Sequence, residues 1–281
     1  MPSRPASADH GRIDRRFVGV GGLRLSVSWE GDGPPLLLIN GLGANLELWR
    51  PLRAQLDAVS TNAFDAPGTG ASTTPRFPMR MRALAAVVTG LLDELGQDRV
   101  DVLGYSFGGA LAQQLALDAP HRVRRLILAA TTAGAVSIPG NPWALLHLLS
   151  PLRYYSAAYL RRSVPTIAGG RTARDPEILR AHAADRLASP PTFWGYQSQL
   201  CSIAGWTSAH WLRRLPQRTL VMTGDEDPLV PMANARFLAG RIPRACLHVV
   251  PGGGHLFLID QPEDVTGVIT RFLTDPAQEQ R

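Results

Sequence analysis

The chain has 281 residues, of which 45% are apolar, so it is long enough to build a full core in one α/β domain that carries an insertion. Its formal net charge of +6 is carried by arginine alone, because the sequence contains no lysine. This excludes Ser-Lys dyads, Schiff-base chemistry and a P-loop, and the scattered arginine clusters lack the aromatic groove of a nucleic-acid site.

The N-terminal residues and the cysteines bear on the cellular compartment of the protein. Residues 1–14 are polar and contain no apolar stretch typical of a secretion signal, so we expect a disordered leader. No apolar run approaches the roughly 20 residues that a membrane span needs. The two cysteines, Cys201 and Cys246, argue against a disulfide framework. Together these features predict a cytoplasmic protein.

The first predicted elements are a β-hairpin and a buried strand. Residues 16–29 alternate between apolar and polar around a Gly-Gly turn, which is a hairpin pattern. The apolar run 36–39 is typical of a parallel strand, and it ends in the Gly-rich loop Asn40-Gly-Leu-Gly43. Such a loop can direct a backbone N–H toward a reacting oxygen, so we assign Leu42 N–H to an oxyanion hole. An ordinary strand-to-helix loop is the alternative.

The next elements are a helix over 47–58, a strand over 61–65 and a second helix over 82–95. Asp65 follows the strand, but it precedes the candidate nucleophile in the chain. We therefore interpret it as a structural carboxylate that accepts hydrogen bonds from loop N–H groups.

The stretch from Val100 to Ala116 has the pattern of a short buried strand followed directly by a helix. Ser106 lies at the sharp turn between them, with Gly104 and Gly108 two residues to either side. Only small neighbours tolerate such a turn, and its G-x-S-x-G spacing is typical of a nucleophilic serine. We assign the following N–H, that of Phe107, to the oxyanion hole. A structural Gly/Ser turn is the alternative.

After a strand over 123–129 the alternation of strand and helix stops, and it resumes only near residue 217. We predict a helical cap over 135–216 inserted into a core of 15–134 and 217–281, in an α/β hydrolase fold with a mostly parallel, doubly wound sheet. The cap aromatics could form its own core or contact substrate. The candidates for substrate contact are Trp143, Trp194, Trp206, His210 and Trp211.

In the last third of the chain the α/β pattern resumes with the stretch 219–228, followed by a helix near 232–240, a strand over 246–250 and a last helix over about 262–272. A serine hydroxyl needs an imidazole to take its proton and a carboxylate to orient that imidazole. Ser106, Asp227 and His255 occur in the chain order of α/β hydrolases. Asp225 is the alternative carboxylate, and Asp227 is preferred because a loop beyond the strand must reach the histidine.

Several further stretches make the chain similar to one family of α/β hydrolases. They are GLGANLELW (41–49), GGALAQQLA (108–116), LAATTAGAVSIPG (128–140), SPLRYY (150–155), PTIAGGRTARDPE (165–177), GWTSAHWL (205–212), GDEDPLVP (224–231) and GHLFLI (254–259). With them the chain resembles the intracellular depolymerases of medium-chain-length polyhydroxyalkanoates over about residues 36–272.

This resemblance implies a catalytic triad at Ser106, Asp227 and His255, and Asn40 also matches the group as a candidate substrate-binding residue. Two departures bear on the side-chain length of the substrate. Phe107 stands where members of the family often carry tryptophan, and the run Gly252–Gly254 is one residue longer.

The expected function is therefore that of a serine hydrolase that cleaves the ester bonds of poly(3-hydroxyalkanoate) and releases 3-hydroxyalkanoic acids or oligomers. The surface of a polymer granule is the candidate partner. A small-molecule carboxylesterase, lactonase or C–C bond hydrolase is the alternative. A non-catalytic granule- or ligand-binding protein is a third. No metal or cofactor is expected, because the histidines and cysteines lack ligand spacing and no dinucleotide fingerprint follows the first strands.

Overall fold

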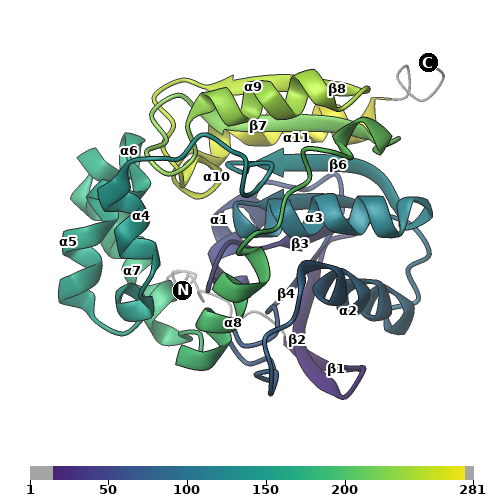
Figure 1. Cartoon of the computed structure of the whole chain (residues 1–281), viewed down its shortest axis with the longest axis horizontal. Helices are drawn as coiled ribbons and strands as arrows, with labels where there is room; N and C mark the ends of the chain where they lie inside the picture. The colour runs from purple at the N-terminus through teal and green to yellow at the C-terminus, as the bar shows by residue number, and fades with distance from the viewer. Residues whose placement is uncertain (1–14, 276–281) are drawn as a thin grey trace, which may run out of the picture.

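Eight strands form a twisted sheet at the centre of the computed structural model, which describes residues 15–275 apart from the side chains at 181, 182, 184, 185 and 188 (Figure 1). The strands follow one another across the sheet in the order β1-β2-β4-β3-β5-β6-β7-β8. Their bounds are β1 Arg16–Val20, β2 Leu23–Glu30, β3 Pro35–Ile39, β4 Ser60–Phe64, β5 Val100–Tyr105, β6 Val123–Ala129, β7 Arg218–Gly224 and β8 Ala245–Val250.

The strand directions confirm the predicted hairpin and the predicted parallel sheet. β1 pairs with β2, and β2 with β4, in antiparallel fashion, whereas β3 to β8 pair in parallel. Gly21 and Gly22 turn the hairpin at φ values of 54° and 81°, a region that glycine enters without strain. The carboxyl ends of the parallel strands therefore meet at one edge of the sheet, where α/β proteins build their sites.

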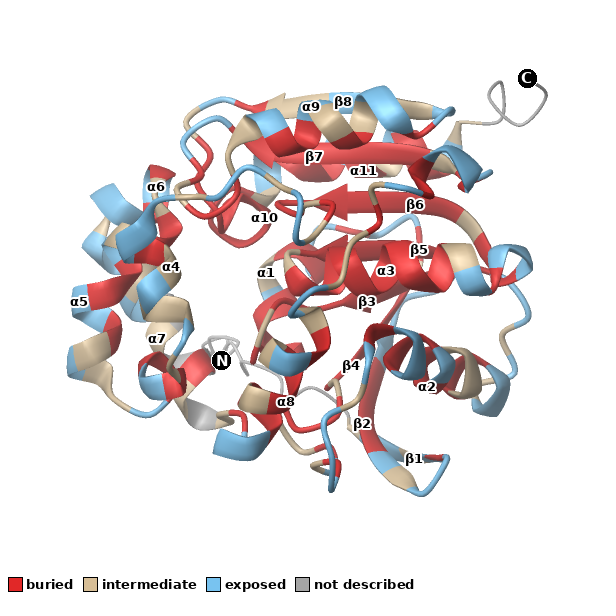
Figure 2. Ribbon diagram, viewed as in Figure 1, coloured by how far each residue is buried: buried red, intermediate tan, exposed pale blue. Residues whose placement is uncertain are grey.

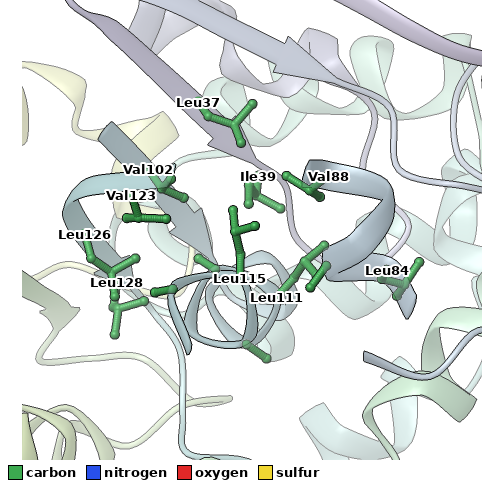
Figure 3. Close-up of a cluster of buried hydrophobic side chains, with 14 of the residues drawn as sticks. Leu37, Ile39, Leu84, Val88, Val102, Leu111, Leu115, Val123, Leu126 and Leu128 are labelled. Atoms are coloured by element: carbon green, nitrogen blue, oxygen red, sulfur yellow. The ribbon is translucent and has the colours of Figure 1, made fainter. Parts of the chain in front are cut away.

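Helices cover both faces of the sheet. One face carries α2 (Met81–Glu94), α3 (Phe107–Asp118) and α9 (Met232–Arg241), and the other carries α1 (Arg50–Arg53), α10 (Phe257–Asp260) and α11 (Pro262–Thr274). Figure 2 shows the inner strands β3 to β7 and α3 as mostly buried. Figure 3 shows the packing on the first face, where strand side chains such as Ile39 and Val102 face Leu111 and Leu115 of α3. The three-layer α/β fold that the alternating pattern predicted is confirmed.

The helix predicted over 47–58 is wrong. A 3₁₀ turn, η1 (Leu46–Trp49), and the single turn α1 stand in its place. Pro51 has no N–H to donate into a continuous helix, and the buried Arg53 donates instead to the Thr61 hydroxyl and to Ser28 Oγ. These bonds hold the chain end of α1 against β4 and β2, so the chain turns before a longer helix can form.

Five helices connect β6 to β7, in the region where the cap was predicted. They are α4 (Pro142–Leu148), α5 (Ala157–Ala168), α6 (Gly170–Arg174), α7 (Pro176–Ala188) and α8 (Phe193–Ile203). Helices α4 to α7 lie together on one side of the sheet (Figure 1). The boundaries at 134/135 and 216/217 stay a prediction, and the predicted leader, residues 1–14, lies outside the described residues. Across residues 15–275, we find no helix that is both long and apolar enough to span a bilayer.

Candidate active site

Ser106 occupies a strained position between β5 and α3. Its φ and ψ are 55° and −117°, which is unusual for a residue with a side chain. The two flanking glycines are required by close backbone contacts, since a Cβ on Gly104 would lie 2.4 Å from Gly108 O and one on Gly108 would lie 2.1 Å from Ile39 O. The turn directs the Ser106 side chain to the edge where the parallel strands end.

The structure brings Ser106, His255 and Asp227 into one hydrogen-bonded chain. His255 Nε2 lies 3.1 Å from Ser106 Oγ, and His255 Nδ1 lies 2.8 Å from Asp227 Oδ2. The Asp227 carboxylate and the imidazole are both buried. Asp225, the alternative carboxylate, is exposed to solvent. With the proton on Nδ1 bound by Asp227, Nε2 is free to accept the proton of the serine hydroxyl.

Backbone groups hold both partners of Ser106. Asp227 Oδ1 accepts from Leu229 N and Val230 N at 2.8 and 2.9 Å, which leaves Oδ2 to face the imidazole. His255 N donates to Ala168 O at the end of α5, and Tyr105 OH donates to His255 O at 3.0 Å. The histidine is therefore positioned by a cap helix as well as by the sheet.

Two unpaired backbone N–H groups lie beside Ser106. Those of Leu42 and Phe107 donate no hydrogen bond to any residue of the described range 15–275, and both residues line a cavity together with Ser106 and His255. The Leu42 carbonyl accepts from Tyr154 OH at 2.7 Å, and Gly43 N donates to Gln199 Oε1 at 2.8 Å. Cap side chains thus hold the loop that presents the Leu42 N–H, as an oxyanion hole needs.

Two cavities meet at Ser106 and share Leu42, Leu148, Leu229 and His255. The larger one has a volume of about 220 Å³, and we call it the apolar cavity because mostly aliphatic side chains line it. Its aliphatic lining includes Leu42, Leu145, Leu148, Leu200, Ile203, Leu229 and Val230. The smaller one has a volume of about 50 Å³, and we call it the arginine cavity because Arg153 and Arg186 line it.

The structure does not bring the six predicted substrate-binding residues to Ser106. None of them lines the apolar cavity or the arginine cavity. Asn40 is buried and uses its amide to bridge the Gly-rich loop, where it donates to Asn45 O and accepts from Gly41 N. Trp143 and Trp194 are exposed on the cap surface, at 70% and 45%.

The other three residues lie outside these cavities for a different reason. Trp206, His210 and Trp211 border a separate surface hollow beside α2 and α3. Trp211 is buried in the core of that face, and Trp206 Nε1 donates to Gln114 Oε1 at 2.8 Å. Aromatic content alone therefore misled the choice of residues, since these rings anchor the cap to the sheet or face solvent.

Sequence reasoning missed the residues that do line the cavities. Leu148, the neighbours Arg153 and Tyr154, and Arg186 come from three different places in the cap, and no spacing links them to Ser106. The stretch 150–155 contained a signal, because it was one of the stretches on which the family resemblance rested.

Two smaller expectations are also settled. Asp65 is fully buried and accepts from Leu46 N and Ala71 N, so its structural role is confirmed. Burial raises the pKa of the Asp65 carboxyl, although these two N–H groups oppose the shift.

Cys201 and Cys246 are free thiols. Within the described chain, we find no cluster of three His, Cys, Asp or Glu side chains that could hold a metal ion.

We predict that Tyr154→Phe lowers the kcat of ester hydrolysis roughly 2- to 13-fold, because one hydrogen bond that orients the Leu42 peptide is lost. KM for a small p-nitrophenyl ester should change less than kcat. Tyr159→Phe is the matched control, since it removes a hydroxyl that bonds His147 elsewhere in the cap. Equal losses of kcat in the two variants would show that the Tyr154 hydroxyl does not position the loop.

A family model described as alpha/beta hydrolase fold matches residues 34–262. The chain is also 48% identical to a poly(3-hydroxyalkanoate) depolymerase of Ectopseudomonas oleovorans over 245 residues, which cover 87% of this chain and 86% of the relative.

More distant relatives carry other activities. A 2-hydroxy-6-oxo-2,4-heptadienoate hydrolase of Pseudomonas putida is 29% identical over 92% of this chain and 95% of its own. The crystal structure of an enol-lactonase from Burkholderia xenovorans LB400 superposes with a TM-score of 0.80 at 24% identity, over 92% of this chain and all (100%) of that one. At that identity the likeness concerns the fold alone.

Proposed function

The chain belongs to the α/β hydrolase family and, within it, to the group of the poly(3-hydroxyalkanoate) depolymerases; on this premise we propose that it is a serine hydrolase that cleaves the ester bonds of that polymer. The observation that carries the proposal is the hydrogen-bonded chain from Ser106 through His255 to Asp227 at the junction of two cavities. The apolar cavity offers room for an alkyl-substituted acyl chain beside the nucleophile.

In the first half of the proposed reaction, Ser106 Oγ attacks the ester carbonyl carbon while His255 Nε2 takes the hydroxyl proton. The carbonyl oxygen becomes anionic and accepts hydrogen bonds from the N–H groups of Leu42 and Phe107. Asp227 stabilises the imidazolium that forms. The bond from the carbonyl carbon to the ester oxygen then breaks, and His255 returns its proton to the leaving alcohol.

In the second half, a water molecule attacks the acyl-serine ester. His255 takes one proton from the water, and the same two N–H groups hold the new oxyanion. The bond between the acyl carbon and Ser106 Oγ breaks, and the proton returns from His255 to the serine. The products are the free acid and the regenerated enzyme.

A set of large, exposed apolar side chains on the cap and on the loop before α2 supports docking on a solid polymer, and we call it the apolar face. It consists of Phe77, Trp143, Leu146, Leu149, Leu152, Tyr155, Phe193 and Trp194. Its members between positions 143 and 155 recur at every third position. Tyr155 OH donates to Pro191 O, and Trp194 Nε1 donates to Pro75 O, so these two side chains hold neighbouring loops. Figure 2 shows much of the cap surface as exposed.

We propose that this apolar face binds the surface of a poly(3-hydroxyalkanoate) granule. Monomeric proteins rarely expose so many large apolar side chains together unless an apolar partner covers them. A polymer chain must leave an insoluble apolar phase to reach Ser106, and the face lies on the same cap whose Leu145, Leu148 and Leu200 line the apolar cavity.

A cytoplasmic location stays a prediction. The two free thiols suit a reducing compartment. Cell fractionation tests this location.

The experiment that tests the substrate is the release of 3-hydroxy acids from purified polymers of short and medium side-chain length. We expect the purified protein to release 3-hydroxy acids, and to favour the medium side-chain polymer because the cavity at Ser106 is aliphatic. Hydrolysis of soluble esters without any release from polymer would instead favour a small-molecule carboxylesterase, lactonase or C–C bond hydrolase. A protein that hydrolyses none of these substrates would be the non-catalytic binder.

We predict that Trp143→Ala lowers adsorption to polymer granules, and activity on them, by roughly 5- to 150-fold, because a large exposed side chain of the apolar face is lost. Activity on a soluble p-nitrophenyl ester and Tm should stay close to the parent's, since Trp143 is 70% exposed and lines neither cavity.

Trp211→Ala is the contrasting variant, because Trp211 is 5% exposed and part of the core. Its loss should destabilise the fold by roughly 3–5 kcal/mol and reduce activity on both substrates together. Parallel losses on granules and on the soluble ester in Trp143→Ala would argue against docking through this face.

A further inference from the structure

The arginine cavity contains two buried guanidinium groups, and no acid among the described residues pairs with them. Arg153 is 3% exposed and Arg186 is 9% exposed, and no carboxylate of the described residues forms a salt bridge with either. Both groups lie over the ring of Tyr154, at 4.8 Å from its centroid for Arg153 and 5.9 Å for Arg186. This places two positive charges close together beside Ser106 and His255.

The two arginines differ in how their N–H groups are used. Arg153 donates to Tyr196 OH at 2.7 Å, and to the carbonyls of His147, Ser150 and Leu42 at longer distances of 3.4 to 3.5 Å. The guanidinium of Arg186, in contrast, makes no hydrogen bond or ion pair with any residue that the structure describes, and its Nε is completely buried. Arg153 is therefore held in place by the cap, whereas the N–H groups of Arg186 are available to a ligand.

A buried cation without a partner is costly to the folded protein, because the charge loses its hydration and gains no compensating interaction. A guanidinium is always charged and its fork of N–H donors matches a carboxylate in two-point geometry. The cost disappears when a carboxylate of the substrate enters the cavity. The volume of about 50 Å³ suits a group of that size, a carboxylate with the methylene beside it, and is too small for an alkyl side chain as well.

We propose that the arginine cavity binds the free terminal carboxylate of the substrate chain, with Arg186 as its ligand and Arg153 as the neighbouring fixed charge. This inference rests on the proposed function and names the part of the polymer that the enzyme recognises. In a poly(3-hydroxyalkanoate), the free carboxylate belongs to the last unit, whose 3-oxygen is esterified by the acyl group of the unit before it.

The direction of the chain in the site follows from this placement. The acyl group of the penultimate unit lies at Ser106 with its alkyl part in the apolar cavity, and the terminal unit is the leaving alcohol. Attack by Ser106 breaks the bond between the acyl carbon and the 3-oxygen, His255 protonates that oxygen, and the terminal 3-hydroxyalkanoate leaves from Arg186. The enzyme therefore removes single units from the carboxyl end, and monomer should be its first product.

The first test compares the dimer of 3-hydroxyoctanoic acid with the methyl ester of the same dimer, which has no charge at its end. In the parent enzyme KM should be lower for the free acid. Arg186→Gln should raise KM for the free acid roughly 10- to 150-fold, as expected for a lost hydrogen bond to a charged group, and should leave the methyl ester nearly unchanged. Arg186→Lys keeps the positive charge but lacks the fork of N–H donors. Its KM for the free acid should lie between that of the parent and that of Arg186→Gln.

Arg180→Gln is the matched control, because Arg180 lies on the same helix α7, is exposed, and pairs with Glu177 on the surface. Arg180→Gln should leave KM unchanged for both dimers. If Arg186→Gln affects the free acid and the methyl ester alike, or affects neither, the proposal is wrong. Since the parent comparison of the two dimers needs no variant, the proposal is tested even where Arg186→Gln does not fold.

A second test does not depend on the polymer. Octanoate and octanamide are compared as competitive inhibitors of p-nitrophenyl butyrate hydrolysis, and octanoate should be the stronger one in the parent and in Arg180→Gln but not in Arg186→Gln. Equal inhibition by both compounds in the parent would overturn the carboxylate site. Stronger inhibition by octanoate together with no cleavage of polymer or dimer would overturn the proposed function and leave the carboxylate site standing.

Discussion

Ser106→Ala and His255→Ala should each reduce kcat for ester hydrolysis by roughly 10⁴- to 10⁶-fold, because nucleophile and base act as one unit. The reason lies in the 3.1 Å contact between Ser106 Oγ and His255 Nε2, without which a serine hydroxyl is a poor nucleophile at neutral pH. A p-nitrophenyl ester measures the loss directly. Tm should change little for Ser106→Ala, since alanine meets the same backbone strain at φ 55° as serine does.

The double variant Ser106→Ala/His255→Ala provides the control for this assignment. Its residual activity should equal that of the single variants, since removing a second member of a unit costs little once the first is gone. Additive losses would mean that the two side chains act independently. Near-parent turnover in either single variant would remove that residue from the proposed mechanism.

Asp227→Asn should lower kcat by roughly 10⁴-fold, the size of effect seen where an orienting aspartate is neutralised in a serine protease. The contacts of Asp227 explain the expected loss. Its Oδ1 accepts from Leu229 N and Val230 N, so an asparagine would keep its oxygen there and turn its NH₂ group toward His255 Nδ1. The imidazole would then carry its proton on Nε2, where it cannot accept the proton of Ser106.

Asp225→Asn is the matched comparison, because Asp225 is two residues away and exposed. We expect its kcat to stay within roughly twofold of the parent's, since surface changes away from the site have small effects. The same ester assay measures both variants. A larger loss in Asp225→Asn than in Asp227→Asn would assign the orienting role to Asp225.

The site is assembled from two parts of the chain, the sheet and the cap. Strand ends of the sheet supply Ser106, Asp227 and His255, while cap residues fix the surroundings. Ala168 O accepts from His255 N, and Gln199 accepts from Gly43 N. A movement of the cap would therefore change the position of the base and that of the oxyanion-hole loop together.

The amino-acid sequence by itself determined the sheet, the turn at Ser106 and the order of the three triad candidates. These features are local, or follow from local ones. Strand and helix periodicities are read over fewer than 20 residues, and Gly104 and Gly108 are needed because of contacts within and beside one turn. The preference for Asp227 over Asp225 was also a local argument, since it concerned how far a loop extends beyond β7.

Only the tertiary structure decided which cap residues reach the site. Trp143 and Trp211 have the same side chain and lie in the same insertion, yet one is 70% exposed and the other 5%. Periodicity within a helix shows which residues share a face, but not which partner covers that face, because burial depends on how several helices pack on the sheet. The two charges of the arginine cavity come from positions 33 residues apart (186 − 153) in an insertion without regular spacing. Their common position beside Ser106 results from long-range packing, which no pattern along the chain records.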